Sequence, residues 1–180
     1  MIKFIFTADI HLKLWGDKEY TDDGLPLKLV EILNVVEQMC VYAKKNDIPA
    51  IVIGGDLNDT KGIASVRAFV LFKQIVERYP NIHFYILHGN HDAVASEYAQ
   101  KESAIQLVDG YSNVTTIMEP TKIDNMLFLP FSKTVGEEIQ NNMEDDTSID
   151  ILISHFGLNE ATLSSGISIK STLSARNLVM

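Results

Sequence analysis

The stretch Ile51–Asp59, IVIGGDLND, decides the fold of this chain. Its first four residues are apolar or glycine, which is typical of a short strand buried on both faces of a sheet. The strand leads through Gly55 into Asp56, and a carboxylate at the end of a buried strand costs free energy unless another group pairs with it. Asp56 is therefore the first candidate functional residue.

Three other apolar stretches end in the same way. They are Ile2–His11 (IKFIFTADIH), Phe84–Asp92 (FYILHGNHD) and Ile149–His155 (IDILISH), and each delivers Asp, Asn or His at its end. Ligands of open α/β sheets bind in the crevice beyond the carboxyl ends of the strands. Four strand ends that supply oxygen and nitrogen donors predict a metal site. A carboxylate at its centre predicts a site for more than one ion.

Helical patterns separate the first three strands. Apolar residues recur at steps of three and four from Leu29 to Ala43, which predicts a helix that ends near Asn46. A second helix is expected after Ser65, a residue suited to an N-cap, and Pro80 should stop it. The alternation of strands and helices predicts an α/β fold with a parallel sheet covered by helices.

The second half of the chain is less regular. Short strands are predicted over Val114–Met118, Met126–Leu129 and Ile149–Ser154, a helix over Val135–Met143, and partly helical structure over Ala93–Val108. No internal repeat or low-complexity linker interrupts the sequence. We therefore expect residues 1–180 to belong to one domain.

Composition and charge restrict the class of protein. The chain has 180 residues, of which 46% are hydrophobic, and a net charge of −9. The N-terminus meets Asp9 too early for a signal peptide, and the single cysteine, Cys40, excludes an internal disulfide, so a cytoplasmic location is expected, in the host cytoplasm if a phage encodes the chain. The negative charge argues against a simple electrostatic grip on nucleic acid, although bound divalent ions would offset part of it locally.

The polar residues at the strand ends have the spacing of metal ligands. Asp9 and His11 are two residues apart, so in an extended segment their side chains point the same way. Gly89-Asn90-His91-Asp92 places an amide, an imidazole and a carboxylate on one turn. Mixed donors of this kind suit manganese, iron or zinc better than calcium. Two ions that share a carboxylate are the arrangement used for phosphoester cleavage, and a nearby imidazole can protonate the departing oxygen. By contrast, His83 and His88, which flank the third strand, are expected to be structural.

The order D-x-H, G-D-x-x-D, G-N-H-D and then a strand-end histidine resembles the calcineurin-like metallophosphoesterase superfamily. Within it, ADIHL, GGDLND, GNHD and SHFGLNE are similar to the SbcD-type DNA repair exonucleases, including the phage recombination endonuclease subunit. The resemblance covers about Ile2–Leu158 and implies a sandwich of β-sheets flanked by helices. It also implies two divalent metal ions as cofactors, with manganese the expected metal.

The resemblance implies a role for each candidate residue. Asp9 and His11 would hold the first ion, Asn90 and His155 would hold the second, and Asp56 would bridge both. His91 would be the general acid, with Asp92 orienting it. Asp59 would lie next to the metal ligands without binding an ion itself.

This sequence lacks one motif of the family pattern. The family completes its site with a downstream G-H-x-H motif, and no histidine follows His155 in this sequence. We expect this chain to be the N-terminal part of a longer nuclease that lacks the last strands of the fold. Each ion would then keep three protein ligands in place of four, with weaker metal binding and reduced activity.

Three functions remain open at this point. The first is a DNA exonuclease and endonuclease subunit of recombination and double-strand-break repair, with DNA as substrate, an SbcC-type ATPase as partner and a homodimer as assembly. The second is another phosphoesterase, acting on phosphoproteins, cyclic nucleotides or small phosphate esters, which the acidic charge favours. The third is a domain without catalysis that binds partners.

Overall fold

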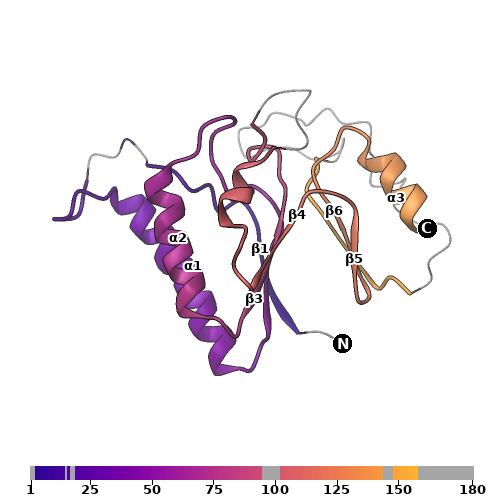
Figure 1. Cartoon of the computed structure of the whole chain (residues 1–180), viewed down its shortest axis with the longest axis horizontal. Helices are drawn as coiled ribbons and strands as arrows, with labels where there is room; N and C mark the ends of the chain where they lie inside the picture. Colours follow the sequence, from indigo (N-terminus) through magenta and orange to yellow (C-terminus); the bar gives the residue numbers. More distant parts are fainter. Residues whose placement is uncertain (1–2, 15, 17–18, 95–101, 144–147, 158–180) are drawn as a thin grey trace. The chain divides into compact units, whose positions relative to one another are not determined.

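The computed structural model describes residues 3–14, 16, 19–94, 102–143 and 148–157 (Figure 1). The chain divides into two compact units, Met1–Met118 and Glu119–Met180. Within the part of the chain that is described, none of the helices is both long and apolar enough to cross a bilayer.

The first unit is built on a sheet of four parallel strands. These are β1 (Phe4–Thr7), β2 (Ala50–Ile53), β3 (His83–Leu87) and β4 (Val114–Ile117), in the order β1-β2-β3-β4. The predicted parallel α/β sheet is therefore confirmed. Because all four strands run in the same direction, their carboxyl ends meet at one edge of the sheet.

Two helices cover one face of this sheet, α1 (Leu27–Lys45) and α2 (Val66–Arg78), and lie side by side (Figure 1). The sheet register aligns Ile51 with Phe84, and both are buried in the core that the helices complete. The ring of Phe72 on α2 meets Phe84 edge to face at 6.4 Å. Ser65 caps α2 as predicted, because its side chain accepts a hydrogen bond from the Ala68 amide.

A short 3₁₀ helix, η1 (Ala104–Val108), precedes β4. Ser103 and Gln106 form a capping box at its start, in which the side chain of each residue accepts a hydrogen bond from the backbone N–H of the other. The predicted partly helical stretch Ala93–Val108 is thus helical at its end, and residues 95–101 lie outside the described part.

The second unit contains a three-stranded mixed sheet. The strand β5 (Thr121–Ile123) pairs antiparallel with β6 (Met126–Leu129), which pairs parallel with β7 (Ile151–Ser154). The helix α3 (Val135–Met143) has the predicted bounds. The strand β5 was not predicted, because three residues are too few to establish an alternating pattern.

Candidate metal centre

The loops that follow β1 and β2 stay paired beyond the strands. The amide of Asp9 donates to the carbonyl of Gly55 at 3.1 Å, and that of His11 donates to the carbonyl of Asp56 at 3.0 Å. This backbone ladder holds Asp9, His11 and Asp56 next to one another, although more than forty positions separate the two loops in sequence.

The same three residues have an unusual backbone. Asp9, His11 and Asp56 have φ angles of +56°, +53° and +55°, and they are three of the five described non-glycine residues with positive φ. Aspartate and histidine tolerate this left-handed region better than most residues, but strain of this kind costs of order 1–3 kcal/mol per residue. Such strain gathers at functional sites, where the surrounding contacts impose it.

Asp56 is the central side chain, with 3% of its surface exposed. Its Oδ1 accepts a hydrogen bond from the His91 amide at 2.8 Å, and its Oδ2 lies 3.9 Å from Nε2 of His11. Gly89 passes so close that a Cβ added there would overlap both the backbone nitrogen and the carboxylate of Asp56. The turn after β3 is thus packed directly against this carboxylate.

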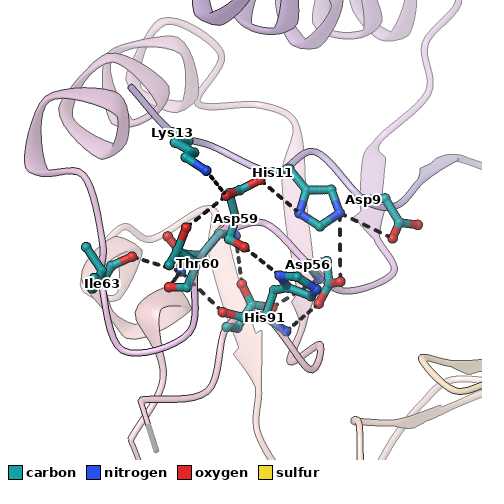
Figure 2. Close-up of polar contacts among 10 residues, drawn as sticks. Asp9, His11, Lys13, Asp56, Asp59, Thr60, Ile63 and His91 are labelled. Carbon is teal, nitrogen blue, oxygen red and sulfur yellow. Dashed lines mark hydrogen bonds and ion pairs between the residues drawn. The ribbon is translucent and has the colours of Figure 1, made fainter. Parts of the chain in front are cut away.

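Two histidines and a second carboxylate complete the cluster (Figure 2). Nε2 of His11 lies 3.6 Å from Oδ1 of Asp9. The rings of His11 and His91 meet edge to face at 5.0 Å. One donor atom each from His11, Asp56 and His91 lies within 4.8 Å of the others. Residues from the ends of β1, β2 and β3 therefore converge, as the parallel topology predicts.

These residues fit a divalent cation. Two carboxylates and two imidazoles are the mixed oxygen and nitrogen donors that such ions bind. Among the described residues, the buried Nδ1 of His11 has no hydrogen-bond partner, so protein hydrogen bonds do not account for the orientation of this ring. Carboxylates gathered around one buried Asp56 repel one another unless a positive charge lies among them.

The ring of His91 is held by a backbone carbonyl. Its Nδ1 is hydrogen-bonded to the carbonyl oxygen of Asp59. A carbonyl can only accept, so Nδ1 carries the proton, and Nε2 is the ring nitrogen that remains for a ligand or a proton.

The described hydrogen bonds of Asp92 are with backbone amides, and its predicted role in orienting His91 stays a prediction. Its Oδ2 accepts from the amides of Asp56 and Gly89 at 3.0 and 2.8 Å, and its Oδ1 accepts from the amide of Asn58 at 2.8 Å. Burial raises the pKa of Asp92 to about 6, although the amides of Asn58 and Gly89 oppose this. Because three backbone amides donate to its oxygens, Asp92 connects the loops after β2 and β3. Among the described hydrogen bonds of the His91 ring, the partner is the carbonyl of Asp59.

The carboxylate of Asp59 faces away from the central Asp56. Its Oδ2 accepts from Nζ of Lys13 at 2.7 Å and from the hydroxyl of Thr60 at 2.8 Å, while its Oδ1 lies 3.8 Å from Nδ1 of His11. The predicted place of Asp59 outside the metal ligands stays a prediction.

One buried residue of the site was not singled out from sequence. Asn58 is 1% exposed, and its side-chain amide donates to the carbonyls of Thr60, Ile63 and His91. It joins the loop after β2 to the turn after β3. The available signal was an amide side chain between Asp56 and Asp59, directly after a buried strand, since such a group is buried where it finds partners.

Asn90 and His155 are placed as follows. Asn90 is half-buried on the turn between Gly89 and His91. His155 directly follows β7 in the second unit and is also half-buried. Their participation as ligands of a second ion stays a prediction. His83 and His88 are structural as expected, with hydrogen bonds to the hydroxyls of Thr115 and Ser103.

Comparison with known proteins adds the family. The model of the calcineurin-like phosphoesterases matches residues 2–174. The chain is also similar to the crystal structure of the Pseudomonas putida nuclease MPE, with 16% identity and a TM-score of 0.43 over 70% of this chain and 52% of that one. It thus spans about half the length of that nuclease. No curated protein matches the chain.

Proposed function

This chain belongs to the calcineurin-like phosphoesterase family, and on that premise we propose that it hydrolyses phosphodiester bonds of DNA with two divalent metal ions. The observation that carries the proposal is the convergence of His11, Asp56 and His91, with donor atoms within 4.8 Å, at the carboxyl ends of three parallel strands. Asp9, whose Oδ1 lies 3.6 Å from His11, extends this donor set.

The proposed roles are those that the resemblance to the family implies. Asp9 and His11 would hold one ion, Asp56 would contribute to both, and Asn90 and His155 would hold the other. When bound, two such ions supply Lewis acidity and neutralise charge on the phosphoryl oxygens. Manganese is the metal we propose, because the resemblance implies it and the mixed carboxylate, amide and imidazole donors are compatible with it.

His91 is proposed to donate the proton. Its Nδ1–H is fixed on the Asp59 carbonyl, so a proton on Nε2 is the one that can pass to the departing oxygen of the phosphodiester. The close packing of Gly89 against Asp56 keeps this turn at a fixed distance from the central carboxylate. Both features support a general-acid role that needs a defined ring orientation.

The biological setting of the activity is also a proposal. The motifs ADIHL, GGDLND and GNHD support a role in recombination and double-strand-break repair, with an SbcC-type ATPase as partner and a homodimer as assembly.

A second candidate is a phosphoesterase for small phosphate esters. The net charge of −9 favours it, because a DNA-binding surface usually carries an excess of Lys and Arg.

One experiment separates the candidates. The chain is incubated with Mn²⁺ and either linear duplex DNA or bis(p-nitrophenyl) phosphate, alongside Asp56→Asn and the exposed control Asp23→Asn. DNA degradation that Asp56→Asn abolishes and Asp23→Asn retains is the expected result. Cleavage of the small ester alone would favour the second candidate. The absence of both activities would contradict the proposal for this chain.

A further inference from the structure

A side-chain pair continues the backbone ladder between the loops after β1 and β2. The ladder ends where the Leu12 amide donates to the carbonyl of Leu57 at 2.7 Å. At the next residue, Nζ of Lys13 lies 2.7 Å from Oδ2 of Asp59, a residue 46 positions away in sequence. The two loops are therefore connected once more, by an ion pair.

This pair is partly shielded from water. The side chain of Asp59 is 16% exposed and that of Lys13 is 40% exposed. Burial acts to raise the pKa of Asp59, but the hydrogen bonds from Lys13 and Thr60, together with the positive charge of Lys13, act against it, and the pKa lies below its usual value. A charge-assisted hydrogen bond of this length restrains the carboxylate more strongly than a neutral one.

Asp59 in turn contacts both histidines of the cluster (Figure 2). Its carbonyl accepts the hydrogen bond from Nδ1 of His91, and its Oδ1 lies 3.8 Å from Nδ1 of His11. The restrained carboxylate and the accepting carbonyl belong to one residue. A restraint on the side chain therefore limits where the carbonyl can lie.

We propose that Lys13 is a positioning residue that acts through Asp59 and keeps the ring of His91 with its Nδ1 proton on the Asp59 carbonyl. The effect on turnover rests on the proposed function, whereas the effect on the ring of His91 does not. A direct contact between Lys13 and a substrate phosphate is the competing explanation, since lysines often bind the backbone of nucleic acids. The ammonium already donates to Asp59, which favours the positioning role.

The test compares Lys13→Met, Lys13→Arg and the control Lys61→Met, which removes an equal charge from an exposed position in the neighbouring loop. The imidazole ¹H–¹⁵N spectra of the metal-free chain, at one pH with EDTA, report which ring nitrogen of His91 is protonated. In wild type the Nδ1–H form should dominate. In Lys13→Met the Nε2–H form should gain severalfold in population, while Lys13→Arg and Lys61→Met should resemble wild type.

Steady-state kinetics on the phosphodiester provide the second measurement. We expect kcat to fall about tenfold in Lys13→Met with KM unchanged, in the range found for residues that orient a site from outside. An unchanged His91 spectrum in Lys13→Met would overturn the inference, and so would an equal change in Lys61→Met or a rise of KM alone. If the wild-type chain cleaves no phosphodiester, the proposed function fails, and the His91 spectrum still decides the role of Lys13.

Discussion

Two acidic residues near the cluster, Asp92 and Asp59, shape it through hydrogen bonds that involve backbone groups. Asp92 has both carboxylate oxygens on amides of three other residues, and Asp59 holds His91 with a main-chain carbonyl. Buried charged groups persist in proteins when hydrogen bonds replace their lost hydration. The acidic residues near the cluster thus divide into candidate ligands and residues that order the loops.

The first prediction concerns Gly89→Ala. The new Cβ would overlap the backbone nitrogen and the carboxylate of Asp56, so the turn after β3 must move. We expect a loss of about 1–3 kcal/mol in the free energy of unfolding, measured by urea denaturation. Gly16→Ala is the control, because no atom of the described residues lies within 4 Å of its Cβ position. Equal stability of the two variants would show that the packing against Asp56 is loose.

The second prediction concerns the pH dependence contributed by His83. Burial lowers the pKa of His83 from the ordinary value of 6.5. Below pH 6.5 the unfolded chain therefore binds this proton more readily than the folded chain. The stability that depends on neutral His83 is present above pH 6.5 and is lost as the pH falls from 6.5 through the lower pKa of the folded state.

His83→Gln should therefore flatten the pH profile. Glutamine can still bond to the hydroxyl of Thr115 but does not titrate. The free energy of unfolding, measured from about pH 7 to pH 5, should decrease less in the variant than in wild type. Parallel profiles would mean that this histidine contributes nothing to the acid sensitivity.

At the scale of elements, the strands and helices place the site, and the loops shape it. The helices α1 and α2 pack on one face of the sheet, so the apolar residues of β2 and β3 are buried. The strand ends converge at one edge because the strands are parallel. The helix bounds depend on local signals, such as the cap at Ser65, that are independent of the site.

The third prediction tests that cap. Ser65→Ala removes the side-chain acceptor of the Ala68 amide and should cost about 0.5–2 kcal/mol of stability. Ser65→Asp should restore most of the loss, because aspartate accepts the same bond and favours the helix N-terminus. Thermal denaturation followed by circular dichroism gives both values. A failure of Ser65→Asp to recover stability would assign the loss to something other than capping.

At the scale of the whole molecule, a bound cation should couple folding to the site. The segments that follow three different strands contribute to the cluster, so an ion that binds there binds the folded chain alone. Ligands of this kind stabilise by mass action, by about 2.7 kcal/mol at a concentration 100 times the Kd.

The fourth prediction is that Mn²⁺ raises the Tm of wild type and that EDTA reverses the rise. Asp56→Asn should lose this response, because it removes the central negative charge, whereas exposed Asp23→Asn should keep it. Differential scanning fluorimetry at several Mn²⁺ concentrations provides the measurement. An equal rise of Tm in Asp56→Asn would place the ion elsewhere.

Much of this architecture could be predicted from sequence. Apolar runs that end in Asp9, Asp56 and His91 predicted the strands, and parallel pairing brings such ends to one edge whatever the details of the loops. The periodic apolar pattern of α1 predicted its bounds within a residue or two, because helix periodicity is a local property.

Other features depended on the tertiary structure alone. The hydrogen bonds of Asp92 to the loop after β2 and of His91 to the Asp59 carbonyl join segments that are remote in sequence. The positive φ angles at Asp9 and His11 are imposed by contacts with such segments. The sequence by itself determined which polar residues follow the strands, because apolar runs separated by helices indicate parallel strands whose carboxyl ends meet at one edge. The tertiary structure decided how each one is held, because a hydrogen-bond partner is chosen by the distance and direction of atoms in loops that no local pattern specifies.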